Sequence, residues 1–493
     1  ITVEPILLMN AAAHTGTEVI KESLQLDKSC LVTLNYTEDI CQHLQDHQDE
    51  SIKVQQASST LNGAALAVQD FLPILLLAYI GPLADRWGRR PFIYLAIIGG
   101  SFETISYLLN SIFFNWPAYV TLVGPLLLSL SGGQAAFQML MFVYISDITN
   151  LSNRTLRIGI LKVCMSYGKP FGRLIMGQLL AVSGYVTVFS TSLVLYILCL
   201  IYTYVRLKES LPQTKRNLAS SNGLKDIYIL PYNAGKVVLR RRPGYKRLTI
   251  ILTMTSCAIG LFCMKAPLFL FFRYIFGWNA TVFSNWMFYK EMLAATAQLF
   301  TVSCLIRVLK WSDYSLAMSS NCSEALMFIL LAQMTTPLST ESSSQGPYKA
   351  IIIAGPLLGM INNNVFISIR AIMSKSVDTP AELGKLFAAQ GMIESLAMTS
   401  AGPIYAALYN VTIGYFPGTI MMFSAILFFI SMCLFYIQFI KNRRDTKHEE
   451  TKDVISVEGA MNGRDTKHEE TKEVISVEET ANGRDTKHKE GKR

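Results

Sequence analysis

Charged residues are scarce in this sequence: only 16% of its 493 residues are Asp, Glu, Lys or Arg, whereas soluble domains contain about 25%. Hydrophobic residues make up 51% of the chain, and they gather in long runs. Each run is near the ~20 residues that a transmembrane helix needs. The composition therefore excludes an ordinary soluble domain and predicts a protein that crosses the lipid bilayer several times.

Cysteine and histidine are also scarce, at nine and six residues. Nine cysteines are too few for a disulfide scaffold, and a buried thiol is the ordinary state of those inside apolar runs. His448, His468 and His488 are evenly spaced only because the end of the chain repeats with a period of twenty residues. The sequence contains no metal-ligand cluster, phosphate-binding loop or nucleophile paired with a base. We therefore expect no cofactor, no metal site and no enzyme.

The net charge of +9 raises the question of a nucleic-acid partner. The basic residues, however, are spread over connections between apolar runs. This distribution is typical of cytoplasmic loops in membrane proteins, which carry an excess of Lys and Arg. We therefore expect the lipid bilayer as a partner and no nucleic acid.

The apolar runs fall into two sets of six. They lie at about 3–20, 63–83, 91–113, 117–146, 158–180 and 184–206, and then at 248–272, 284–306, 314–335, 349–370, 383–409 and 415–440. The pattern predicts an all-α membrane protein with twelve transmembrane helices in two six-helix halves. The halves are residues 1–206 and 248–440.

Three polar segments complete this organisation. Residues 21–60 have more acidic than basic residues and are expected on the extracellular side, whereas 207–247 form a basic cytoplasmic linker. Residues 441–493 consist of 20-residue repeats with too few apolar residues to bury a core. We expect them to form a disordered cytoplasmic tail.

The external segment contains features typical of an oxidising exterior. Cys30 and Cys41 are separated by polar sequence, and we expect a disulfide between them, with two free thiols as the alternative. Asn35 begins an Asn-Tyr-Thr sequence, which is a glycosylation acceptor.

Ionisable residues inside the apolar runs indicate function, because each costs ~2.5 to 3.5 kcal/mol to insert into the bilayer. Lys162, Lys169 and Arg173 lie within roughly 40° of one another on a helix and form one cationic stripe. Facing the central cavity and pairing with carboxylates of neighbouring spans are both open for this stripe. Lys265 and Arg370 add cations in the second half. An excess of cations facing a cavity favours an organic anion as the solute.

A short charged turn joins the second and third runs. It reads Gly81-Pro82-Leu83-Ala84-Asp85-Arg86-Trp87-Gly88-Arg89-Arg90, in which Pro and Gly allow two helices to reverse. At these residues the chain resembles the major facilitator superfamily, whose signature runs G-x-L-x-D-R-x-G-R-R. In that fold substrate binds near the midplane between two rocking halves. The resemblance implies a conformational latch formed by Gly81, Asp85, Arg86, Gly88, Arg89 and Arg90.

Within that superfamily the chain is similar to solute carrier family 46, the proton-coupled folate transporter family. The similarity rests on several stretches between residues 3 and 440, among them Val3-Glu4-Pro5, Ser146-Asp147 and Arg370-Ala371. It implies secondary active uptake of an anionic solute, such as a folate, a cyclic dinucleotide or a muropeptide, driven by protons. It also links Arg370 to substrate and proton use. The folate-carrying branch differs in having a carboxylate where this chain has Lys162.

Protons would move through buried carboxylates, for which Glu103, Glu291 and Glu394 are the candidates. The resemblance implies the plasma membrane, with the endolysosomal membrane as the alternative. The alternative function is a non-transporting membrane receptor or scaffold on the same fold, with the repeated tail as its docking element.

Overall fold

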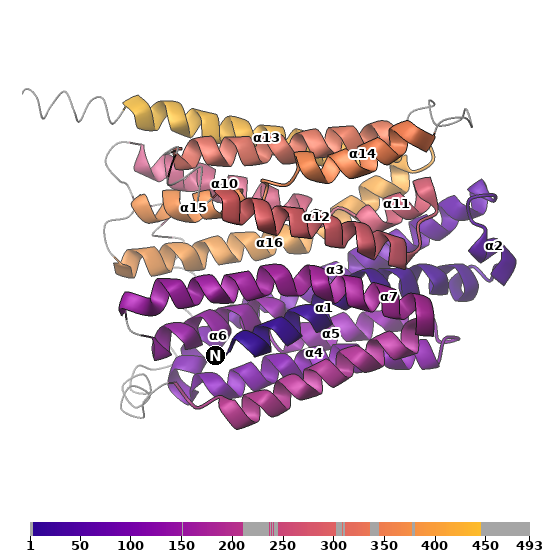
Figure 1. The fold of residues 1–493 in the computed structure, drawn as a ribbon, viewed down its shortest axis with the longest axis horizontal. Helices are drawn as coiled ribbons and strands as arrows, with labels where there is room; N and C mark the ends of the chain where they lie inside the picture. Colours follow the sequence, from indigo (N-terminus) through magenta and orange to yellow (C-terminus); the bar gives the residue numbers. More distant parts are fainter. Residues whose placement is uncertain are drawn as a thin grey trace, which may run out of the picture.

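The computed structural model describes residues 3–149, 151–210, 245–301, 311–335, 345–376 and 380–444, together with positions 236, 238, 240 and 308. All regular secondary structure in these ranges is helical. The helices lie side by side in two groups, one from each half of the chain (Figure 1). Helices satisfy their backbone hydrogen bonds internally, as a lipid environment requires.

The first half crosses the bundle six times. Its elements are α1 (Glu4–Lys28), η1 (Ser29–Thr33), α2 (Glu38–Gln42), α3 (Gln48–Trp87), α4 (Arg89–Ile112), η2 (Ala118–Leu122), α5 (Val123–Leu130), α6 (Gly133–Ile148) and α7 (Leu151–Arg206). The fourth pass is broken between α5 and α6, where Gly132 and Gly133 have φ values of 89° and 64°. α7 contains two passes because the chain leaves the helical conformation at Gly184, with φ 73°. Only glycine adopts such positive φ values without strain.

The second half also crosses six times. Its elements are α10 (Lys246–Cys263), α11 (Leu268–Phe276), α12 (Ala280–Phe300), α13 (Asp313–Ala332), η4 (Gln333–Thr335), α14 (Gln345–Leu358), α15 (Asn364–Lys375), α16 (Pro380–Thr412) and a final helix, Thr419–Arg444. Two passes are broken, one between α10 and α11 and one between α14 and α15. The expected fold class, twelve helices in two halves, is confirmed.

Seven segments of the described residues are long and apolar enough to cross a membrane by length and composition alone. They do not include α1, α12 or α16. These three helices contribute charged side chains to the interior of the bundle, as shown below. Their low apolarity therefore reflects their position around the centre.

The polar segment expected at 21–60 is shorter in the structure, because α1 continues to Lys28 and α3 begins at Gln48. Lys21, which we expected outside the bundle, is buried and binds Glu103. A buried carboxylate needs a cation, and the longer helix supplies it. The final helix runs to Arg444, four residues into the expected tail. Most of the linker at 207–247 and the chain after residue 444 lie outside the described residues, so this division stays a prediction.

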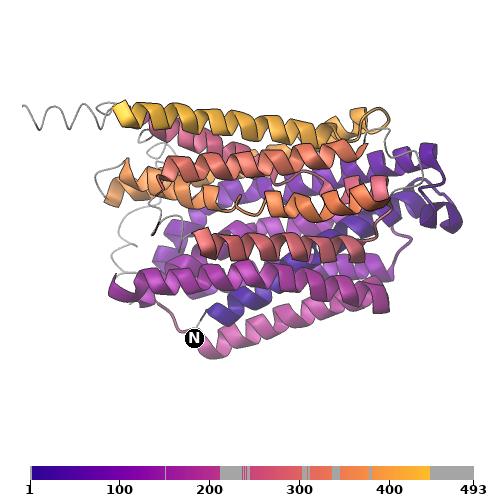
Figure 2. The ribbon, with the colours of Figure 1, turned by 45° about the horizontal axis from the view of Figure 1, so that its top comes forward.

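Glycines bring the helices into direct contact. A Cβ atom at Gly172 of α7 would lie 2.6 Å from Cα of Ala12 in α1. The two halves approach equally closely where α3 meets α16, since a Cβ at Gly63 would lie 2.9 Å from the carbonyl oxygen of Gly402. Figure 2 shows the same two groups of helices from a second direction. Close contact at small residues is the usual way in which helices pack in a membrane.

We expect Gly172→Val to destabilise the protein, because a larger side chain would collide with the α1 backbone. Overpacking of this kind costs about 1–3 kcal/mol, and a rigid backbone leaves little room for relief. The thermal unfolding midpoint of the purified protein measures the effect. Gly159→Val is the matched control on the same helix, since nothing lies within 4 Å of a Cβ at Gly159. Equal midpoints for the two variants would contradict this packing.

Candidate functional site

A cavity of about 560 Å³ lies between the two halves. The first half lines it with α1, α3, α6 and α7, and the second half with the break between α10 and α11, with α15 and with α16. Its apolar walls include Phe137, Phe142, Phe387, Met139, Met165 and Met392. A cavity of this size with mostly apolar walls and a few convergent polar groups is typical of a small-molecule site.

Three cations line the cavity: Lys169, Lys265 and Arg370. Lys265 lies in the break between α10 and α11, and its Nζ is 2.8 Å from Oδ2 of Asp70 in α3. Lys169 and Arg370 come from opposite halves and have no ion pair or hydrogen bond within the part of the chain that the structure describes. The cavity therefore presents two cations that no described carboxylate holds in an ion pair, although Glu18 is near enough to Lys169 to interact with its charge.

The cationic stripe predicted on the fifth pass has members in different surroundings. Lys169 lines the cavity, whereas Arg173 is buried and binds two carboxylates. One Arg173 nitrogen is 2.7 Å from Oε2 of Glu18, and the other contacts Glu291 of α12. Lys162 has an exposed side chain and is not among the residues that line the cavity. Of the three, only Lys169 is placed to meet a solute.

The candidate carboxylates occupy three different sites. Glu103, only 1% exposed, binds Lys21 at 2.6 Å inside the first half. Glu291 joins the halves through Arg173. Glu394 lines the cavity, where it accepts hydrogen bonds from Gln390 at 2.6 Å and from the Cys257 thiol at 3.1 Å.

Sequence reasoning missed the role of α1. His14 and Glu18 line the cavity, and Lys21 reaches Glu103 from the same helix. The spacing of His14, Glu18 and Lys21 at i, i+4 and i+7 places them on one face of a helix. This helical spacing of charged residues is the sequence signal that would have indicated a polar face on α1.

The charged turn is a tight connection between α3 and α4. Gly88 adopts φ 104°, and α4 begins at Arg89. The backbone N–H groups of Arg89 and Arg90 donate to the Glu209 carboxylate at 2.8 and 3.2 Å, and Nε of Arg89 is 3.3 Å from Asp147. These contacts join the start of α4 to α6 and to the first residues of the linker. The side chain of Asp85 lies outside the described residues, so its proposed role stays a prediction.

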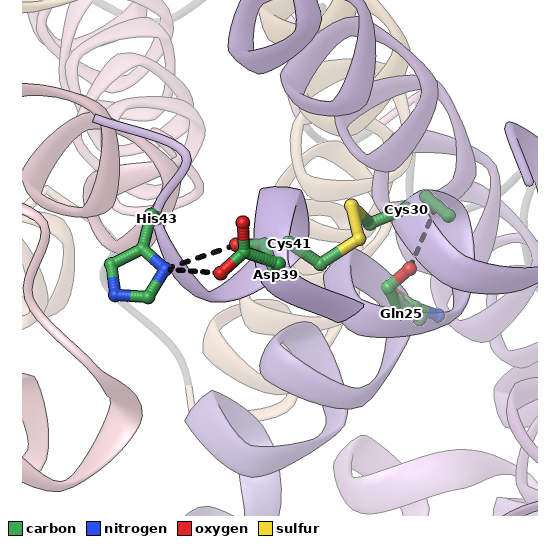
Figure 3. Close-up of a disulfide and its surroundings, with 6 residues drawn as sticks. Gln25, Cys30, Asp39, Cys41 and His43 are labelled. Carbon is green, nitrogen blue, oxygen red and sulfur yellow. Dashed lines mark hydrogen bonds and ion pairs between the residues drawn. A yellow bond between two sulfur atoms is a disulfide. The ribbon is translucent and has the colours of Figure 1, made fainter. Parts of the chain in front are cut away.

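The far end of the bundle, which we call the disulfide end, carries Cys30 and Cys41. Their sulfur atoms are bonded to each other beside Gln25, Asp39 and His43 (Figure 3). Asn35, inside the closed loop, is exposed and has φ 57°. Its glycosylation stays a prediction.

The contacts between the halves gather toward the disulfide end. Gln56 donates to the carbonyl oxygen of Asn410 at 2.8 Å, and Gln178 donates to Asn285 at 2.8 Å. The lining residues of α3, 69–77, lie nearer to its end at Trp87 than to its start at Gln48. The cavity therefore extends toward the opposite end, where the charged turn lies, and the disulfide end is closed.

Comparisons with known proteins agree with this arrangement. The family profile described as Major Facilitator Superfamily matches residues 31–307. The chain is 22% identical to a probable peptidoglycan muropeptide transporter of Drosophila melanogaster, with 91% of this chain and 87% of that protein covered. It is 22% identical to the proton-coupled folate transporter of Rattus norvegicus, with 72% and 73% covered.

A third relative is the lysosomal proton-coupled steroid conjugate and bile acid symporter of Mus musculus, 21% identical, with 87% of this chain and 93% of the relative covered. Among solved structures, a human organic anion transporter matches with a TM-score of 0.60 at 16% identity, covering 88% of this chain and 97% of its own. At this identity the structural likeness shows the fold alone.

Replacing Lys21 by Met should strongly destabilise the protein, because the Glu103 carboxylate would lose its buried cation. Breaking a buried ion pair by removing one partner costs about 3–5 kcal/mol. Lys375→Met is the control, since Lys375 also pairs with a carboxylate, Asp313, but its side chain is 73% exposed. An exposed pair contributes only about 0–1 kcal/mol. Thermal unfolding compares the two variants, and a similar small loss in both would contradict the buried pair.

Proposed function

This chain belongs to the Major Facilitator Superfamily and is a multi-pass membrane transporter rather than an enzyme, and we propose that it carries organic anions through the cavity between its halves. The observation that carries the proposal is the pair of cations, Lys169 and Arg370, which face one cavity from opposite halves and form no ion pair among the described residues. Ammonium and guanidinium groups bind carboxylate and phosphate strongly where water is excluded.

The walls of the cavity favour an anion with an apolar or ring-bearing body. Phe142 and Phe387 come from opposite halves, and several methionines adapt to irregular shapes. The relatives are named as transporters of muropeptides, of folate and of steroid conjugates and bile acids. We propose folate-like, cyclic dinucleotide or muropeptide-like solutes as the substrate class of this chain.

The proposed cycle alternates the opening of the cavity between its two ends. The contacts at the disulfide end, such as Gln178 to Asn285, would break when the cavity opens outward, and the charged turn would act as a latch at the other end. Because two groups of relatives are named as proton-coupled, we propose that protons drive uptake. Glu394 is the candidate carboxylate that faces the solute directly. The proposed location is the plasma membrane, with the endolysosomal membrane as the alternative.

We expect Lys169→Ala and Arg370→Ala each to weaken the apparent affinity for the transported anion by about 10- to 100-fold, because a hydrogen bond to a charged group contributes about 1.5–3 kcal/mol. Uptake into expressing cells measures this effect. The assay uses a reduced folate, a cyclic dinucleotide and a muramyl dipeptide as separate probes. Each probe is tested at about pH 5.5 and about pH 7.4, which span the range in which histidine and perturbed carboxylates exchange protons.

Lys375→Ala, a charge removed at the end of the bundle, is the control for expression and folding. Normal uptake by the two cavity variants, at normal surface expression, would refute the assignment of Lys169 and Arg370. Failure of every probe to accumulate would instead favour a receptor or scaffold.

A further inference from the structure

A continuous chain of charged side chains runs from the interior of the first half to the second half. Lys21 Nζ is 2.6 Å from Glu103, and another oxygen of Glu103 is 4.0 Å from Nε2 of His14. Nδ1 of His14 is 3.6 Å from Glu18, which binds Arg173 at 2.7 Å. Arg173 then contacts Glu291 in α12.

This chain of groups is one positive charge short of balance. Lys21 and Arg173 are its two cations, and they face three carboxylates. The imidazole of His14 lies between two of these carboxylates, where a proton on the ring would supply the missing positive charge. An uncompensated charge is costly in a low-dielectric interior, so the chain gains free energy when one proton is bound.

The unsatisfied polar atoms around His14 point to the same conclusion. His14 Nε2 and the facing oxygen of Glu103 are both buried, and neither has a hydrogen-bond partner among the described residues. Neutral imidazole has one N–H donor and one acceptor nitrogen, so with carboxylates on both sides one nitrogen always faces another acceptor. Protonated imidazole has two N–H donors and satisfies Glu18 and Glu103 together.

We propose that His14 binds the coupling proton, and that it does so when an anion occupies Lys169. The proposal rests on the proposed function of anion transport and names its proton site. Lys169 lines the same cavity as His14 and Glu18, and its charge offsets part of the carboxylate excess while the cavity is empty. An anion bound to Lys169 would cancel that charge. His14 would then take up a proton. By linkage, the proton would raise the affinity for the anion by the same factor as the anion raises the affinity for the proton.

Other charged groups surround His14 and contribute to its surroundings. On α1 they are Glu18, Lys21 and Glu22, on α4 Glu103, on α7 Lys169 and Arg173, and at the cavity wall the Asp70–Lys265 pair. Asp70 and Lys265 balance each other. Glu22, one turn beyond Glu18, is hydrogen-bonded to Asn62 and is the nearest alternative proton acceptor on α1.

The proton also bears on the closure of the disulfide end. Arg173 is shared between Glu18 of its own half and Glu291 of the other half. A protonated His14 would attract Glu18 and leave Arg173 to Glu291, which favours the closed contact between the halves. Loss of the proton would let Glu18 compete for Arg173 and weaken that contact. Closure of the disulfide end would then be favoured when the protein holds both the proton and the anion, as a symporter requires.

The test needs no substrate. Nuclear magnetic resonance of the full chain in lipid nanodiscs, with ¹³C-labelled histidine, follows the six histidines, and the signal lost in His14→Gln identifies His14. We expect this signal to titrate as the pH is lowered. Lys169→Gln, which removes the charge as a bound anion would, should move the midpoint upward by about half a pH unit or more.

Lys375→Gln is the matched control and should leave the midpoint unchanged, because Lys375 is at the end of the bundle. A His14 signal that does not titrate, or a midpoint that ignores Lys169→Gln, would overturn the proposal. The midpoints are measured in chains in which His14 is intact, and His14→Gln serves only to assign the signal.

Uptake of a muramyl dipeptide into proteoliposomes separates this proposal from the proposed function. We expect acid-stimulated uptake in the unchanged chain and in Glu22→Gln, and loss of the acid stimulation in His14→Gln. Acid-stimulated uptake that persists in His14→Gln would overturn the proton site and leave anion transport standing. A His14 that titrates and responds to Lys169→Gln, without uptake of any anion, would support the proton site and count against the transport function.

Discussion

The balance of buried charge is the constraint on which the rest of this structure depends. Lys21 compensates Glu103 in the buried interior, and Lys265 compensates Asp70 at the cavity wall. The pairing fixes how far helices extend and which faces they turn inward, because an unpaired buried ion costs several kcal/mol. The Arg173 contact with Glu291 and the Asp70 contact with Lys265 also cross between the halves. Charge balance therefore determines both the stability of the bundle and how its halves meet.

Broken helices and glycine contacts place these charges around the cavity. The break between α10 and α11 carries Lys265 to the cavity wall, and the contact at Gly172 holds α1 against α7, so that His14 and Lys169 line one space. Irregular backbone within a membrane bundle is tolerated where it lines a cavity. Lys169 and Arg370, which form no ion pair among the described residues, then remain for a solute. The arrangement connects helix packing to the chemistry of the solute.

Much of the fold could be predicted from the sequence, because apolar runs near the length of a bilayer and a signature turn are local patterns. The twelve passes and the helix reversal at Gly88 follow from them. The pairing of Lys21 with Glu103 could not, since it joins residues 82 positions apart and Lys21 lies in a polar stretch. The sequence also could not show that Lys162, Lys169 and Arg173 lie in different surroundings. Helical periodicity shows that three residues share a face, but not which neighbours that face meets along its length.

The central claim is that one anion and one proton cross this protein together. The most direct measurement is the concentration gradient of a transported anion at which net flux through the purified protein in proteoliposomes is zero, for a series of imposed pH gradients with the membrane potential clamped at zero. The account predicts that this balancing gradient rises about tenfold for each unit of pH difference, as expected for one proton per anion. A flux that vanishes at equal anion concentrations, whatever the pH gradient, would contradict it.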